Sequence, residues 1–415
     1  MKSNLKKSFI WNTLGSGLNS FNSLFFLVIV TRINGINDAG IFTLSFTTAG
    51  ILLVIANYSG RTYQVTETDK EVTDNEYIIN RVITSVIMLL ISIVFGVVND
   101  YNNYKLTIFL LLCLFKATEA ICDVFHGILQ KNNRLDIVGE SLFIRSLLNI
   151  IIFLVVDYFT ENLILSCVSL TIVNIIILLF MDIRKSLRYK ERKKQLNVKA
   201  VFKIFTFGFY TFGVTLVSNY LVNIPRYAID ANMNESFQTI YGIIVMPATV
   251  IVLMNQFVMQ PLITILKEHY TEGNMQKLFK TVRKTILVTV IIGLFTIIIA
   301  YFLGIPVLNF IYDIKLDEYR IDLILILLGA TIYAITCILS NIMLIARKTK
   351  VQFIIFMVVT LISYVTSYKL VDIFGFQGAA YSYVLNMLLL LIVYIVVFIK
   401  IFKKKESSKY ARKNK

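Results

Sequence analysis

Five polar side chains recur at helical spacing between residues 116 and 130, namely Lys116, Glu119, Asp123, His126 and Gln130. Steps of three and four residues place them on one face of a helix, so Lys116 can reach Glu119, and Asp123 can reach His126. An ionisable group at the centre of a bilayer costs about 2.5–3.5 kcal/mol, so this stripe predicts a hydrated cavity. The alternative is a self-neutralising structural pair near the helix ends, with side chains that extend to water.

The two carboxyl groups of this stripe are candidate ion sites. A carboxylate in a low-dielectric environment can change its protonation in the working pH range, so Glu119 and Asp123 are predicted to bind H⁺ or Na⁺. We expect no cofactor and no metal centre. The four cysteines lie in apolar runs without paired spacing, and the chain has no GxxxxGK phosphate-binding loop.

Uncharged amides and hydroxyls form further stripes. The first apolar segment contains Asn12, Ser16, Asn19 and Ser23, and the seventh contains Asn219, Asn223, Arg226 and Asp230 around Pro225. Gln256 lies in the eighth segment, beside Asn255. Proline removes a helical N–H, and helices that combine proline with amides are typical of transporter cores. The alternative is that the amides and serines hold neighbouring helices together.

Three arginines within or next to apolar segments could bind an anion. They are Arg61, Arg145 and Arg226. The planar guanidinium group matches the oxygens of a phosphate, so a pyrophosphate headgroup is the expected ligand if the three arginines face one cavity. The alternatives are structural, because Arg226 can pair with Asp230, and Arg61 and Arg145 lie near helix ends, where they can extend to water.

Transmembrane helices must position these residues. The chain has 415 residues, of which 57% are hydrophobic and 16% charged, and its mean hydropathy is +0.74. A soluble domain cannot bury so much apolar surface, and the composition also excludes a disordered chain. A span needs about 20 apolar residues. This rule predicts an all-α polytopic membrane protein with twelve helices, at 8–32, 38–59, 77–98, 104–128, 138–158, 162–182, 201–228, 237–264, 282–304, 321–346, 350–369 and 377–402.

The 41 Lys+Arg predict the topology. Most of them fall in alternate loops, which predicts that both termini are cytoplasmic and that the net charge of +16 mainly reflects orientation. We expect an N-terminal six-helix lobe (1–183), a basic cytoplasmic linker (184–200), a C-terminal six-helix lobe (201–402) and a basic tail (403–415), with the two lobes around a central cavity. The linker is expected to contact anionic membrane lipids, and charge alone does not support nucleic-acid binding.

Several segments resemble bacterial polysaccharide flippases of the Wzx type, in the multidrug/oligosaccharidyl-lipid/polysaccharide exporter superfamily. The matching segments are Gly60–Thr66 (GRTYQVT), Phe125–Gly139, Ser218–Tyr227 with its Pro-Arg-Tyr sequence, and Asn255–Leu262. The resemblance covers the whole chain in helix count and loop layout, but its motifs do not identify a substrate.

This resemblance implies a function and a site. It implies two lobes that form a V in the bacterial cytoplasmic membrane, and a cargo of undecaprenyl-pyrophosphate-linked oligosaccharide moved to the outer leaflet. Arg226 and Arg61 become candidate cargo contacts through the matched segments, which also contain Gln64 and Gln256. Lys116 and Arg145 are candidates through charge and position, and Asn219 and Asn223 through their stripe. A polysaccharide polymerase and chain-length proteins are the implied protein partners.

Three other functions compete with this one. A drug/cation antiporter of the same superfamily would need an acidic cavity, whereas Arg226, Arg145 and Lys116 are basic. A membrane glycosyltransferase or polymerase would need a large outside loop or a carboxylate pair at the membrane surface, and the predicted outside loops are all short. A channel would need a short re-entrant pore segment, which we do not find.

Overall fold

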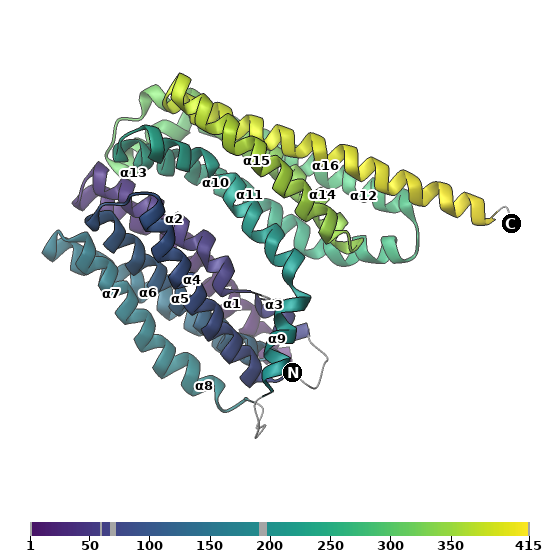
Figure 1. Ribbon diagram of the computed structural model, residues 1–415, viewed down its shortest axis with the longest axis horizontal. Helices are drawn as coiled ribbons and strands as arrows, with labels where there is room; N and C mark the ends of the chain where they lie inside the picture. Colours follow the sequence, from purple (N-terminus) through teal and green to yellow (C-terminus); the bar gives the residue numbers. More distant parts are fainter. Residues whose placement is uncertain (1, 59, 67–71, 191–196, 414–415) are drawn as a thin grey trace. The chain divides into compact units, whose positions relative to one another are not determined.

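The computed structural model describes residues 2–58, 60–66, 72–190 and 197–413, and these residues form helices and no strand (Figure 1). Each of the twelve predicted segments coincides largely with helix, and 201–228 is divided between two helices, so the all-α polytopic fold is confirmed. The helices are α1 Lys2–Ile33, α2 Ile36–Ala56, α3 Gly60–Thr66, α4 Asp74–Val98, α5 Asn103–Lys131, α6 Leu135–Thr160, α7 Leu163–Ile177, η1 Leu178–Ile183, α8 Arg184–Ser186, α9 Val198–Phe207, α10 Phe209–Asn232, α11 Glu235–Thr271, α12 Met275–Ile299, η2 Ala300–Gly304, α13 Ile305–Tyr312, η3 Asp317–Tyr319, α14 Arg320–Ile345, α15 Thr349–Phe374 and α16 Phe376–Lys413.

Ten stretches of helix in the described part of the chain are long and apolar enough to cross a membrane. A further pair, Val198–Thr206 and Phe209–Asn232, passes the same test together and is bent by 55° at its break. The helix of the polar stripe, α5, is not among them, but its 29 residues extend about 43 Å at 1.5 Å per residue, enough to cross a bilayer. The chain is therefore a multi-pass membrane protein, and the count of twelve spans stays a prediction.

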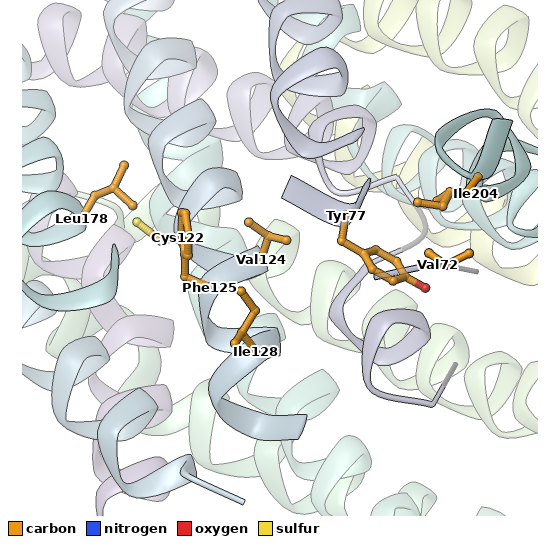
Figure 2. Close-up of a cluster of buried hydrophobic side chains, with 9 residues drawn as sticks. Val72, Tyr77, Cys122, Val124, Phe125, Ile128, Leu178 and Ile204 are labelled. Atoms are coloured by element: carbon orange, nitrogen blue, oxygen red, sulfur yellow. The ribbon is translucent and has the colours of Figure 1, made fainter. Parts of the chain in front are cut away.

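The chain divides into two compact units, Met1–Leu216 (unit 1) and Val217–Lys415 (unit 2). This division lies within α10, C-terminal to the linker predicted at 184–200, because α9 packs against α4. Ala200 and Ile204 of α9 belong to one buried apolar cluster with Val72, Tyr77 and side chains of α5 and η1 (Figure 2). Residues 191–196 of the predicted linker lie outside the described residues, and the predicted lobe bounds stay a prediction.

Side-chain caps fix where the helices of unit 1 begin. Thr73 and Glu76 form a capping box at the start of α4, in which the Thr73 N–H donates to Glu76 Oε2 at 2.8 Å. Glu76 Oε1 also accepts the N–H of Asn197 at 3.0 Å, so the same carboxylate ties the start of α9 to α4. At the start of α5 the Asn102 side chain accepts the N–H of Lys105 at 2.9 Å.

Helix α5 is central to unit 1, where it packs against α2, α4 and α7. Helices α1, α2 and α6 enclose a group of phenylalanine rings. Phe26 lies 5.0 Å from Phe153 and 6.0 Å from Phe46, measured between ring centroids. These separations are typical of favourable aromatic pairs, so the rings form a closely packed apolar surface beside α5.

Glycines allow α1 and α6 to cross at close range. A Cβ added at Gly139 would overlap the main chain of α1 at Trp11 and Asn12, and one added at Gly15 would overlap the Gly139 carbonyl oxygen. Small residues at a crossing let two membrane helices approach until their backbones touch. The crossing fixes α1 against the α5–α6 turn.

We expect Gly139→Ala to destabilise unit 1 by about 3 kcal/mol, because backbone atoms cannot move aside as a flexible side chain can. Thermal unfolding of the purified protein measures the loss. The matched control is Gly17→Ala on α1, where an added Cβ meets nothing within 4 Å. Helix propensity alone would make this control slightly more stable, by up to about 1 kcal/mol. Equal melting temperatures for the two variants would contradict the tight crossing.

Unit 2 is built around α14, which packs against α11, α12 and α16, while α15 packs against α16. Asn255 of α11 connects three of these helices. Its Nδ2 donates to the Ala334 carbonyl at 3.2 Å, and its Oδ1 accepts from Thr289 Oγ1 at 3.1 Å. The buried amide therefore holds helices together, as the alternative interpretation of the amide stripes expected.

Candidate functional site

A polar cavity of about 180 Å³ lies within unit 1, between α1, α2 and α5. It brings together two stripes that the sequence placed far apart, from the first and fourth predicted spans. The lining residues are Asn19, Ser20, Asn22, Ser23 and Phe26 of α1, Phe46 of α2, and Phe115, Lys116 and Glu119 of α5. Amides and hydroxyls thus face an ion pair across a small space walled by three phenylalanines.

The charged wall of the cavity is a single ion pair. Lys116 Nζ lies 2.8 Å from Glu119 Oε2, which confirms the expected pair. The ammonium also lies 4.4 Å from the Phe46 ring centroid and 5.1 Å from that of Phe115. Such contacts are attractive because the ring face carries partial negative charge. The Lys116 side chain is 12% exposed, so the cation is largely dehydrated yet still borders the cavity.

An amide oxygen in the same cavity accepts no hydrogen bond from the described residues. Asn22 is buried, and its Oδ1 has no partner among the described residues. An unpaired buried acceptor costs about 1–3 kcal/mol, so a donor or a cation that entered the cavity would recover that cost. The cavity therefore offers a cation, a carboxylate and an open acceptor within one small volume.

Farther along α5, Asp123 is the centre of an arginine cluster. Its carboxylate lies 3.5 Å from Arg61 of α3 and 3.5 Å from Arg81 of α4. The expected contact between Asp123 and His126 is therefore wrong, because arginines from two other helices take the carboxylate. Two guanidinium groups share one carboxylate, which leaves a net positive charge. The side chains of Arg61 and Asp123 are about one-third and one-quarter exposed, so the cluster is accessible.

Arg81 is the member of this cluster that the sequence pattern missed. It lies in the second turn of α4 and is buried, and its Nη1 donates to the Ala56 carbonyl at 2.9 Å and to Asn57 Oδ1 at 2.8 Å. From charge alone it resembles the basic loop residues that predict the topology. Its position inside the predicted 77–98 span was the signal that could have identified it.

The side chain of Gln64 holds α3 in place. Gln64 is buried, its Nε2 donates to the Val124 carbonyl at 3.1 Å, and its amide occupies the space next to Gly127. A side chain at Gly127 would displace it. Gln64 therefore attaches α3, and with it Arg61, to the main chain of α5. In this structure Gln64 is therefore a positioning residue for Arg61.

Arg145 lies in a buried network rather than at the cavity. It is 2% exposed and pairs with Asp182 of η1. The same carboxylate accepts from Ser141 Oγ at 2.5 Å and lies 2.9 Å from His126 Nε2. A buried carboxylate needs this many partners to offset its dehydration. Arg145 and His126 thus connect α6 and α5 to η1, and neither of them lines the cavity.

The candidate residues of unit 2 differ in exposure. Arg226 of α10 is buried, with its guanidinium 5.5 Å from the centroid of the Tyr241 ring. Asn223 is half-buried and donates from Nδ2 to the Asn219 carbonyl at 2.9 Å. Asn219 and Gln256 expose their side chains. Pro225 lies inside α10, which continues to Asn232.

This fold is that of the MATE transporters. A MATE protein in the bent conformation is 15% identical to this chain, with a TM-score of 0.62 over 98% of this chain and 97% of its own. The Vibrio cholerae MATE transporter VcmN is 11% identical, with a TM-score of 0.61 over 97% and 98% of the two chains. A MOP superfamily transporter from Pyrococcus furiosus is 13% identical, with a TM-score of 0.59 over 96% and 95%.

The family follows from the sequence match. Residues 5–264 match the family described as polysaccharide biosynthesis protein, and the chain belongs to this family. The capsular polysaccharide biosynthesis protein CapF of Staphylococcus aureus is 24% identical over 399 residues, which is 95% of this chain and all of CapF. The predicted resemblance to bacterial polysaccharide flippases is thereby confirmed. The chain is a multi-pass bacterial membrane protein.

Proposed function

We propose that the protein is a flippase that moves undecaprenyl-pyrophosphate-linked oligosaccharide repeat units from the inner to the outer leaflet, for synthesis of a surface polysaccharide. The cavity of unit 1 carries the proposal. There the Lys116 ammonium lies near four amide and hydroxyl side chains, in a chain of the polysaccharide biosynthesis family. An ammonium suits a pyrophosphate, and amides and hydroxyls suit sugar hydroxyls.

Positive charge recurs along α5, and we assign both basic positions to the path of the headgroup. Lys116 and the arginine cluster at Asp123 lie two helical turns apart, which is about 10 Å along the helix axis. In the proposed cycle the headgroup enters while the lipid tail stays in the bilayer, and the two lobes alternate between inward-open and outward-open states. Asn219 and Gln256 remain candidate contacts for sugars in unit 2, and Arg226 remains a candidate through its matched segment.

The product of this cycle would need further proteins. A repeat unit delivered to the outer leaflet must be joined to others, so a polysaccharide polymerase and chain-length proteins are the partners we propose. The drug/cation antiporter remains the competing function, and the same experiment distinguishes the two.

Complementation tests the proposed function. We expect the wild-type chain to restore surface polysaccharide in a bacterial strain that lacks its own repeat-unit flippase, measured by immunoblot of the polymer. The control is the same strain with an empty vector. Failure with several chemically different repeat units, together with a gain of resistance to cationic drugs, would instead support the antiporter.

We further propose that transport is coupled to H⁺ or Na⁺ at Glu119 and Asp123. Glu119 lines the cavity, and Asp123 is about one-quarter exposed. We expect the double variant Glu119→Gln/Asp123→Asn to reduce polymer export at least tenfold and to remove its dependence on external pH and Na⁺, because neither amide can bind a proton or hold a cation by charge.

The matched control for this variant is Glu161→Gln, an exposed carboxylate between α6 and α7. This control should export polymer at the wild-type rate with the wild-type response to pH and Na⁺. If the double variant also keeps that rate and response, the coupling proposal is wrong, although the proposed cargo would still stand.

A further inference from the structure

A second polar pocket of unit 1 lies at the ends of three candidate spans. The spans Ile10–Ile33 and Leu135–Thr160 begin here, and Leu163–Ser186 ends here. The pocket has a volume of about 230 Å³ and is lined by Lys7 of α1, Arg134, Asp136, Ile137 and Glu140 around the start of α6, and Lys185, Arg188 and Tyr189 at and after α8. It therefore lies at the level where a bilayer has its headgroups, outside the site proposed for the cargo.

Internal contacts hold two of the four cations that line this pocket. Arg134 binds both oxygens of Asp136, from Nε and Nη2, each at 3.0 Å. Lys185 Nζ lies 3.2 Å from Glu140 Oε2. Tyr189 contacts Arg134 and packs against the apolar cluster of Leu129, Ile137 and Val138. The walls of the pocket are thus fixed by ion pairs and packing.

The other two cations are Lys7 and Arg188, which lie outside these ion pairs. Among the described residues, neither Lys7 nor Arg188 forms an ion pair, and both side chains are exposed. Four cations and two carboxylates leave the lining with a net charge of +2, which is the complement of a phosphate group. Arginine and lysine together can supply a fork of N–H donors and a point charge to phosphate oxygens.

Exposed apolar side chains continue from the pocket along the surface of unit 1. Ile10 and Leu14 follow Lys7 on one face of α1 and are 44% and 51% exposed. Leu187, next to Arg188, is 54% exposed. A molecule with its phosphate in the pocket could therefore lay an acyl chain along α1, whereas a free phosphate would gain nothing from this surface.

We propose that this pocket binds the phosphate of an anionic membrane phospholipid. The lipid would connect the start of α1 to the end of α8, through Lys7 and Arg188. The basic linker predicted at 184–200 is expected to contact anionic lipids, and this proposal assigns one such contact to the pocket at its start. The proposal depends on neither the cargo nor the coupling ion.

Thermal unfolding of the full-length protein in a nonionic detergent tests the proposal. The probes are dioleoylphosphatidylglycerol, dioleoylphosphatidylcholine and inorganic phosphate, each titrated separately. We expect phosphatidylglycerol to raise the melting temperature in a saturable way, and the other two probes to leave it near its starting value. An equal rise with phosphatidylcholine, or with inorganic phosphate, would overturn the assignment to an anionic lipid.

Charge-matched variants show where the lipid binds. In Lys7→Gln/Arg188→Gln, the phosphatidylglycerol concentration for half-maximal stabilisation should rise about 25-fold, fivefold for each cation removed. The control Arg184→Gln/Lys199→Gln removes the same charge from exposed residues that do not line the pocket, and it should titrate as the wild type does. Equal weakening in both double variants would mean that general surface charge attracts the lipid, and would overturn the pocket.

Discussion

Lys116→Gln is expected to reduce export of surface polysaccharide by about 10–100-fold. A hydrogen bond to a charged group contributes about 1.5–3 kcal/mol, and this ammonium is largely dehydrated at the wall of the cavity. Its loss would weaken the hold on a pyrophosphate while leaving the amides and hydroxyls of α1 in place. The measurement is polymer yield in the complemented flippase-null strain, normalised to the amount of protein in the membrane.

A charge exchange separates binding from structure. Lys116→Glu/Glu119→Lys keeps the ion pair between the two positions but moves the cation about one helical turn along α5. If the pair were structural at both positions, this variant would fold and export polymer normally. We expect normal folding with export as low as in Lys116→Gln. Lys116→Arg, which keeps the charge in place, should recover part of the activity.

Arg145→Leu is expected to destabilise unit 1 by about 3–5 kcal/mol. The substitution leaves Asp182 buried without its arginine, and a buried charge that loses one partner has no water to replace it. For a unit of this size the loss corresponds to a melting temperature about 6–20 °C lower. Thermal unfolding in detergent measures the shift.

The double variant Arg145→Leu/Asp182→Asn is the companion experiment. It removes both charges, and an asparagine can still bond to Ser141 and His126, so at least half of the lost stability should return. Arg184→Gln, an exposed arginine on α8, should leave the melting temperature unchanged. If Arg145→Leu proves as stable as the wild type and yet exports no polymer, then Arg145 contacts the cargo, as the sequence first suggested.

The contacts within one helix were predictable, and those between helices were not. The pair Lys116–Glu119 follows from spacing alone, because residues three apart on a helix are neighbours. Asp123 and His126 have the same spacing and do not pair. Each finds a stronger partner on another helix, Arg81 and Arg61 for the aspartate and Asp182 for the histidine. Hydropathy and helical period carry no information about which faces of two distant helices meet.

The sequence by itself determined that the protein is a bundle of membrane helices, because apolar runs of about 20 residues have no other stable arrangement in a bilayer. It also identified the polar stripes and the family. The tertiary structure decided which stripes meet. It joined α1 and α5 around one cavity, put Arg81 beside Arg61, and buried Arg145 with Asp182. Those outcomes depend on how helices pack, since only packing decides whether a charged side chain is left beside a cavity or beside an opposite charge.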